Sequence, residues 1–302
     1  MRTTPGIGRV LPCLLMLLAC GGPDPALDAG AGDAGAPDAS LPPQGPLRIA
    51  TWNLEFFPRD PTTIERVATL IEAERLDMIA VQEISDPAPF FELAGRLRTH
   101  DAVVAQEGPA FLRVGLLVRR DRLEATAVDT LFLDDPNAFP RPVLSAALRV
   151  RPESGVPSFD FRVLVVHLKA GIGADDQARR GSALQTLDRY VQGELAAPER
   201  EHDIIILGDF NDSMIDVSPD NVFSPMFDRP DVYSLLTLPL EESGERTFLR
   251  FEAFLDHVVM TRDTLDEYGA GEVQVRHLEL ELPEYPFVVS DHLPVFVTFA
   301  PR

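Results

Sequence analysis

The chain has 302 residues, of which 45% are hydrophobic, and it carries a formal net charge of −21 at pH 7. A surface this acidic repels polyanions at long range, so the composition argues against a protein that grips nucleic acid through a broad basic face. It leaves open an enzyme that meets one phosphate group through a bound cation.

The first 20 residues have the features of an export signal. A short basic start precedes the apolar run VLPCLLMLLAC (10–20), which is too short to span a bilayer as a mature helix. Its end, LLAC, resembles the lipobox of bacterial lipoproteins, which implies that Cys20 becomes the lipid-modified first residue after cleavage. An ordinary secretory signal is the alternative, and it would keep the export but lose the anchor. We expect an exported protein that is lipid-anchored at a bacterial membrane, in the periplasm or at the cell surface.

The next segments differ sharply in composition. Residues 21–46 are rich in Gly, Ala, Pro and Asp with almost nothing to bury, so they predict a disordered tether. Residues 47–302 contain no such break and are long enough for one large core, so we assign them to one domain. That domain has no cysteine, which excludes disulfides, thiol catalysis and cysteine-ligated zinc inside it.

The domain alternates apolar, β-rich runs with amphipathic stretches. Residues 61–74 and 175–197 repeat apolar side chains at helical spacing. Several of the predicted strands are continuous hydrophobic runs, which implies burial on both faces and therefore a layered α/β domain. We expect strands at 47–55, 78–84, 114–120, 143–150, 161–168, 203–210, 254–261 and 294–300.

Polar side chains gather at or near the ends of these apolar runs. Open α/β sheets build their sites at the ends of strands, so this distribution predicts a polar site there. The residues concerned are Asn53, Glu55, Glu83, His167, Asp209, Asn211 and Asp256.

Six short motifs, taken together, resemble one superfamily. In chain order they are WNLE, QE, VVHLKAG, LGDFND, LDHVV and SDHLPV, and their order and spacing are similar to those of the endonuclease/exonuclease/phosphatase superfamily. That group includes DNase I, abasic-site endonucleases, inositol polyphosphate 5-phosphatases and neutral sphingomyelinases. The resemblance implies a four-layer α/β sandwich, in which two packed mixed β-sheets are flanked by helices. It also implies metal-assisted hydrolysis of a phosphate ester with Mg²⁺ or Mn²⁺.

The resemblance assigns metal and phosphate contacts to individual residues. Glu83 matches the principal metal ligand, Asn53 matches the asparagine that helps to place the same ion, and Asp291 falls on the metal side. Arg141 is a looser match to an arginine that the DNase I branch aims at the substrate phosphate.

The same resemblance implies a catalytic set. His292 would act as a general base or as an electrostatic clamp on the scissile phosphate, and Asp256 would orient its ring. Asp209 would position or deprotonate the attacking water or assist the leaving group, and the sequence does not choose among these roles. Asn211 and His167 would each hold a phosphate oxygen.

Some neighbouring polar residues are expected to lie outside the chemistry. His257 adjoins Asp256, but successive side chains of a strand point to opposite faces, so His257 should turn away from the site. Asp212 is expected to be solvated. The basic residues Lys169, Arg179 and Arg180 could contact phosphate or could be solvated charges, and both interpretations stay open.

The substrate is less well determined than the reaction. We expect a DNase I-like nuclease, monomeric and tethered to a membrane, that cleaves phosphodiester bonds of nucleic acid, because His167, Arg141 and the export signal agree with that branch. A sphingomyelinase-like lipid phosphodiesterase is the alternative, although no aromatic hairpin for lipid insertion is evident. A non-catalytic surface module with the same fold is an alternative of another class, which the presence of the whole catalytic set disfavours.

Overall fold

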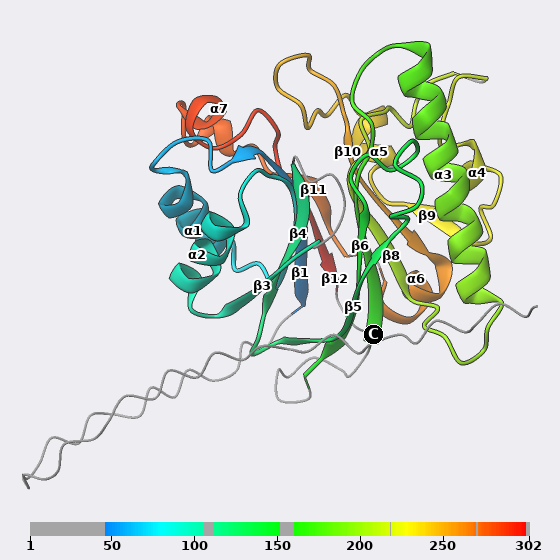
Figure 1. Ribbon diagram of the computed structural model, residues 1–302, viewed down its shortest axis with the longest axis horizontal. Coiled ribbons are helices and arrows are strands. Elements are labelled where there is room, and N and C mark those ends of the chain that lie inside the picture. The colour runs from blue at the N-terminus through cyan, green and yellow to red at the C-terminus, as the bar shows by residue number, and fades with distance from the viewer. Residues whose placement is uncertain (1–45, 106–111, 152–159, 218, 270, 300–302) are drawn as a thin grey trace, which may run out of the picture. The chain divides into compact units, whose positions relative to one another are not determined.

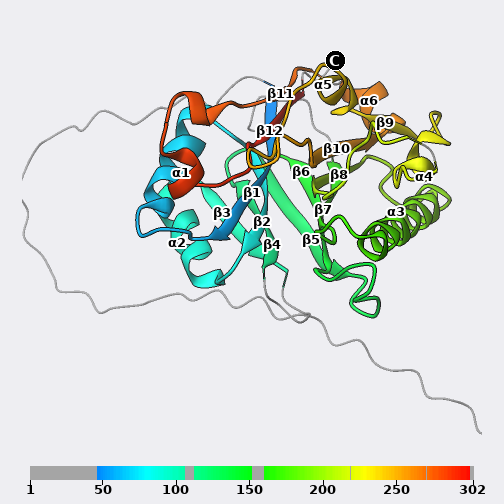
Figure 2. The same ribbon diagram turned by 90° about the horizontal axis from the view of Figure 1, so that it is seen from above.

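The computed structural model describes residues 46–105, 112–151, 160–217, 219–269 and 271–299. The predicted signal, the lipobox residue Cys20 and all of the predicted tether except Pro46 lie outside the described residues. Two mixed six-stranded sheets pack face to face, and helices cover their outer faces (Figures 1 and 2). The predicted four-layer α/β sandwich is therefore confirmed.

The first sheet has the strand order β11-β12-β1-β2-β4-β3. Its central strands β1 and β2 run parallel, while β12 pairs antiparallel with β1, so β12 starts opposite Thr51 in the middle of β1. Helices α1 and α2 cover its outer face (Figure 2). The elements are β1 (Leu47–Phe57), α1 (Thr63–Glu74), β2 (Met78–Ile84), α2 (Pro87–Leu97), β3 (His100–Val104), β4 (Arg113–Arg119), β11 (Val273–Val275), η2 (Leu278–Leu280), α7 (Tyr285–Val288) and β12 (Val295–Phe299).

The second sheet has the strand order β5-β6-β7-β8-β10-β9. Strands β7 and β8 run parallel at its centre, and the long helix α3 covers its outer face (Figure 2). The elements are β5 (Leu123–Leu131), β6 (Val143–Val150), β7 (Asp160–His167), α3 (Ala174–Leu195), β8 (Ile204–Asp209), α4 (Ser224–Phe227), β9 (Tyr233–Leu235), α5 (Leu238–Glu242), β10 (Asp256–Thr261) and α6 (Arg262–Tyr268).

The continuous apolar runs are buried on both faces, as their sequence predicts. Along β7, Val163 and Val165 belong to the core that also contains the first sheet, whereas Leu164 and Val166 pack in the core that contains Leu187 of α3. Burying one such side chain stabilises the fold by about 1.5–3 kcal/mol. The central strands are thus fixed from two sides, which gives their ends a defined position.

All eight predicted strands are present, and their ends lie within two residues of the predicted ones. The sequence pattern did not predict strands β3, β5, β9 and β11, helix α2 or the short helices α4, α5, α6, α7 and η2. Most of β5 is exposed, because it is an edge strand, so it lacks the apolar pattern by which a strand is identified. Among the described residues, none of the helices is long and apolar enough to cross a bilayer.

Candidate active site

The predicted site residues come from both sheets and meet at one end of the sandwich. Asn53 lies on β1, Glu83 near the end of β2, and His167 and Asp209 end the parallel strands β7 and β8. Asp256 begins β10, and the antiparallel pairing of β10 with β8 places it directly opposite Asp209. His292 lies in the loop before β12. Strand pairing therefore brings together residues that are up to 239 positions apart.

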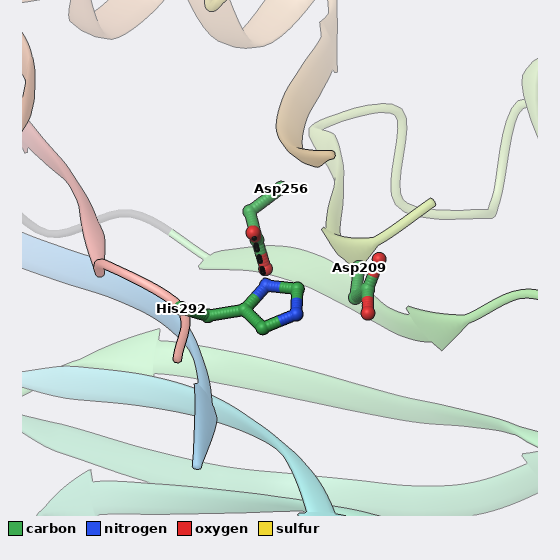
Figure 3. Close-up of side chains that lie close together, drawn as sticks. All are labelled: Asp209, Asp256 and His292. Carbon is green, nitrogen blue, oxygen red and sulfur yellow. Dashed lines mark hydrogen bonds and ion pairs between the residues drawn. The ribbon is translucent and has the colours of Figure 1, made fainter. Parts of the chain in front are cut away.

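The centre of the site is a buried pair, Asp256 and His292. Nδ1 of His292 lies 2.7 Å from Oδ2 of Asp256, and this bond leaves Nε2 on the opposite side of the ring (Figure 3). Burial alone would lower the pKa of His292, but the carboxylates of Asp256, Asp209 and Asp291 raise it to about 10. The ring is thereby oriented by one carboxylate and favoured in its charged form.

A series of buried hydrogen bonds fixes the backbone at His292. The hydroxyl of Tyr285 donates to the His292 carbonyl at 2.5 Å, and the indole N–H of Trp52 donates to the same hydroxyl at 2.9 Å. Ser290 Oγ accepts from the His292 amide at 2.9 Å and donates to the Asn53 carbonyl at 2.6 Å. These contacts tie the loop to β1, so the position of His292 follows from the sheet.

Asp209 faces the same space from the end of β8. Its carboxylate accepts from Nδ2 of Asn53 and from the backbone amide of Asn211, both at 2.9 Å. Burial and the nearby Asp256 carboxylate raise the pKa of Asp209 to about 7, although the positive His292 and the two hydrogen bonds act in the other direction. A carboxyl group with a pKa near neutrality can accept and release a proton under working conditions.

Glu83 approaches from the end of β2, where the strand register is irregular. Its Oε1 lies 3.4 Å from Nδ2 of Asn53 and 3.8 Å from Nε2 of His167, and its Oε2 accepts from the Phe56 amide at 3.1 Å. The backbone φ angle is +64° at Glu83 and +54° at Asn211, a left-handed conformation that costs energy for a residue with a side chain. Such strain collects at functional sites, and here it turns two polar side chains into the site.

The residues present fit a hard divalent cation. Glu83, Asp209 and Asp256 bring three carboxylates together, and Oδ1 of Asp256 is buried with no hydrogen-bond partner in the described part of the chain. Buried charges are costly unless they are paired, and Mg²⁺ or Mn²⁺ prefers oxygen ligands. One group, Asp209, Asp256 and His292, offers three ligand atoms within 4.8 Å of one another. Glu83 adds a further carboxylate beside this group, because Nδ2 of Asn53 lies 3.4 Å from Oε1 of Glu83 and 2.9 Å from Oδ2 of Asp209.

His167, Arg141 and Asn211 form the wall on the side of the second sheet. His167 is buried, and burial together with the positive Arg141 and His292 holds its pKa well below the usual range, so the ring is neutral. Arg141 and Asn211 each donate a hydrogen bond to the Leu168 carbonyl, at 3.2 and 3.3 Å. These side chains can offer hydrogen bonds to a phosphate group, as the sequence predicts for them.

Asp291 lies between Glu55, Arg250 and His292. Its amide donates to Oε2 of Glu55 at 2.9 Å, and its carboxylate lies 3.2 Å from Arg250. Oδ1 of Asp291 is 4.0 Å from Nε2 of His292, so its carboxylate borders the site. Its role as a metal ligand stays a prediction.

Glu55 is a site neighbour to which the sequence analysis gave no role. Burial and the adjacent Asp291 carboxylate raise the pKa of Glu55 to about 6, and Arg59 opposes the shift. Arg59 pairs with one of its oxygens and Arg250 lies 3.4 Å from the other. The position of Glu55 at the end of WNLE could have indicated a role in the site, but its partners lie up to 236 residues away in the sequence.

The prediction that Asp212 is solvated is wrong. The residue is buried, and its carboxylate lies 2.5 Å from Nε of Arg180 on α3. Arg180 also donates to the carbonyls of Lys169 and Gly171, so it holds the loop after β7 in place. Asp212 thus has a partner 32 residues away on α3, and the local sequence around Asp212 does not indicate this ion pair.

The remaining basic candidates have partners within the protein. Lys169 pairs with Asp176 at 2.8 Å. Arg179 is partly buried and donates to the carbonyls of Asn137 and Pro136. Arg179 has no carboxylate partner among the described residues.

His257 lies on the opposite side of β10 from the site. Its Nε2 donates to the Asp212 carbonyl at 2.9 Å, and Nδ1 accepts from the hydroxyl of Thr237 at 3.1 Å. The ring packs against three phenylalanines: Phe210, Phe223 and Phe254. The strand thus separates neighbouring side chains as expected.

The sequence is similar to one known family. A family model described as "Endonuclease/Exonuclease/phosphatase family" matches residues 50–292. No curated protein matches the sequence.

Several solved structures share the fold at low sequence identity. The human Nocturnin catalytic domain is 18% identical with a TM-score of 0.63, and the match covers 86% of this chain and 96% of that one. TDP2 from D. rerio, complexed with a single-strand DNA product, is 15% identical with a TM-score of 0.64 over 84% and 98%. The 3′ phosphatase NExo from Neisseria, bound to a product DNA hairpin, is 19% identical with a TM-score of 0.63 over 84% and 99%.

Proposed function

The chain belongs to the endonuclease/exonuclease/phosphatase family, whose members are metal-dependent phosphoester hydrolases, and we propose that it is a nuclease that hydrolyses phosphodiester bonds of nucleic acid. In this reaction water adds to phosphorus and the ester P–O bond breaks, which releases an alcohol and a phosphate monoester. We also propose that the enzyme is exported and held at a bacterial membrane through Cys20.

One observation carries the proposal: the bonded pair Asp256–His292 faces Asp209 in a site to which five strands contribute side chains. Because Asp256 occupies Nδ1, His292 presents Nε2 to the substrate, where it donates to a phosphoryl oxygen and stabilises the charge that develops there. Asp209 is held by Asn53 and by the Asn211 amide, so its carboxylate is positioned to orient the attacking water and take its proton.

The other wall of the site binds the phosphate. Neutral His167 and the side chain of Asn211 supply hydrogen bonds to the non-bridging oxygens, and Arg141 supplies a positive charge beside them. We propose that Glu83, assisted by Asn53, holds the divalent cation, with Asp291 at the border of the site. When bound, Mg²⁺ or Mn²⁺ supplies charge neutralisation at the phosphoryl group.

Two considerations favour nucleic acid as the substrate. Two of the similar structures, TDP2 and NExo, are described with bound DNA products, and each matches 84% of this chain. His167 and Arg141 also lie together at the site, as in the DNase I-like assignment that the sequence suggested. The acidic surface is compatible with this substrate because the cation and a few basic groups make the contact.

The direct test is plasmid nicking by the full chain in Mg²⁺ or Mn²⁺, with a chelator as the reference condition. We expect supercoiled DNA to become nicked only in the presence of metal. Glu83→Gln should lower the rate by about 10²-fold or more, because the neutral amide binds a divalent cation far more weakly than a carboxylate does.

His277→Ala is a matched control. His277 lies between Glu245 and Glu279, outside the site, so its removal should leave nicking unchanged. Failure of the wild-type protein to cut DNA or RNA in either metal, together with hydrolysis of another phosphoester, would overturn the nuclease assignment and keep the family chemistry.

A further inference from the structure

Residues 248–253 form a tight turn beside His292 that the proposed chemistry does not use. The amide and carbonyl of Phe248 bond to the carbonyl and amide of Ala253, at 2.8 and 3.2 Å. Phe251, inside the turn, is 76% exposed. The segment has no alternating apolar pattern in the sequence, so nothing in the sequence predicts a turn here. The bridge between Phe248 and His292 places this turn next to the site.

The turn places aromatic rings in a row that starts at His292. The ring of Phe248 lies 4.7 Å from the His292 ring at an angle of 34°, and the ring of Phe251 lies 5.6 Å from Phe248 at 49°. Phe248 is partly covered and Phe251 faces solvent. The row therefore leads from the residue that meets the scissile phosphate to open solvent.

The turn is fixed to the site by its backbone and by Arg250. The Leu249 amide donates to the Asp291 carbonyl at 2.9 Å, and the guanidinium of Arg250 lies 3.2 Å from the Asp291 carboxylate. Arg250 also lies 3.4 Å from Glu55. Because the turn is anchored at these points, Phe251 holds a defined position relative to His292, and a preorganised ring loses little freedom on binding.

An exposed ring at this place suits a flat, apolar partner. Burying a solvent-exposed phenylalanine ring against a ligand is favourable, and the face of such a ring is free to stack. Unpaired nucleobases stack on aromatic side chains in single-strand binding proteins, whereas bases inside a duplex have both faces covered.

The charges around the turn also favour a partner that is bound by stacking. Arg250, in the turn, and Arg59 are both paired with Glu55. A duplex is gripped through many phosphate contacts, and a chain of net charge −21 with its local arginines paired offers few of them. Stacking does not depend on net charge, so it can supply the contact that the phosphates do not.

We propose that Phe251, backed by Phe248, stacks on an unpaired nucleobase next to the scissile phosphate, so that the enzyme prefers single-stranded or frayed nucleic acid to duplex. This inference rests on the proposed nuclease function and names the form of its substrate. Phe251 is then a specificity-determining residue that contacts the substrate without taking part in bond breaking.

The test pairs a protein change with a substrate change. Short single strands with one cleavable phosphodiester would carry either a normal nucleotide or a baseless tetrahydrofuran nucleotide on each side of that bond. Phe251→Ala should lower kcat/KM on the base-bearing strand by about 5- to 150-fold, the effect of losing one stacked base. On the strand that is baseless at the stacked position the variant should match the wild type, and Phe251→Trp should restore the preference.

Phe287→Ala is the matched control, since Phe287 is 73% exposed but lies on α7, outside the row. Equal losses on both strands, no loss on either, or faster cleavage of duplex than of single strand by the wild type would overturn the inference and leave the nuclease assignment intact. If the wild type cleaves no nucleic acid, both fall. Hydrolysis of sphingomyelin vesicles that depends on Phe251 would overturn both in favour of a lipid substrate.

Discussion

Two Asp-His dipeptides lie in this chain, and their histidines have opposite environments. His257 follows Asp256 on the regular strand β10, and His292 follows Asp291 in the loop before β12. Both rings are buried, yet Asp256 contacts His292 rather than its own neighbour. The dipeptide itself therefore carries little information, and the backbone conformation decides what each histidine meets.

The difference is also electrostatic. The Asp256 carboxylate and its acidic neighbours offset the effect of burial and raise the pKa of His292 to about 10. Burial among three phenylalanines lowers the pKa of His257 to about 4, although hydrogen bonding to Asp212 and the charge of Asp256 oppose that shift. One region favours a charged ring that can act on phosphate, and the other favours a neutral ring that fills the core.

The largest effect should come from removing the charge that distinguishes the two regions. Asp256→Asn keeps the side-chain shape but removes the carboxylate that orients His292 and favours its charged form. We expect kcat to fall by about 10²- to 10⁴-fold, the range for a positioned acid–base group. Steady-state rates measured beside a thermal unfolding curve separate this loss from misfolding. Activity within tenfold of the wild type would show that the pair does not drive the chemistry.

A second change breaks the register that places Asp256. Gly208 pairs with His257 across β8 and β10, directly before the Asp209–Asp256 pair. Its φ angle is +149°, and an added Cβ would collide with the Val166 carbonyl. Gly208→Ala should therefore destabilise the fold by about 3–5 kcal/mol, the upper range for single substitutions. Denaturant unfolding measures this, and a loss below 1 kcal/mol would contradict the packing described.

The pH dependence of stability tests the environment of His257. Its folded pKa of about 4 lies below its ordinary value of 6.5, so the unfolded state binds the proton more tightly and stability is lost as the pH falls from about 6.5 to about 4. His257→Gln keeps a donor for the Asp212 carbonyl and cannot titrate. Between about pH 6.5 and pH 4 the unfolding free energy of the variant should therefore fall by on the order of 3 kcal/mol less than that of the wild type. Identical pH profiles would refute the assignment of a neutral buried ring.

The smallest effect is expected at the hydroxyl that orients His257. Thr237 donates to Nδ1 of His257 and also accepts from the Val258 amide. Thr237→Val leaves both groups without this partner, so we expect a loss of about 1–3 kcal/mol in unfolding free energy. Turnover should stay unchanged, because the bond lies on the far side of β10. A selective fall in kcat with unchanged stability would place His257 in the chemistry.

Much of this arrangement could be predicted from sequence because it follows from strand patterns. Apolar runs that end in Asp209, His167 and near Glu83 identified both the buried strands and the polar side chains at their ends. The alternation of side chains along a strand was enough to turn His257 away from Asp256. Local periodicity and the order of the motifs were therefore enough to predict the layered fold and the candidate site residues.

The contacts that could not be predicted from the sequence join distant segments that have no periodic pattern. Arg180 neutralises Asp212 from a helix, and Arg250 reaches Glu55 across 195 residues. The aromatic turn at Phe251 escaped notice because its six residues form neither a helix nor a regular strand. Such contacts depend on how loops pack over strand ends, which no spacing in the chain specifies.

The most direct test of the account is the turnover of His292→Ala beside that of His257→Gln, on one nucleic acid substrate in Mg²⁺ at pH 7. The account predicts that His292→Ala loses at least about 10²-fold in kcat while it remains folded, and that His257→Gln stays close to the wild type. Comparable rates for the two variants would contradict the assignment of the chemistry to the Asp256–His292 pair.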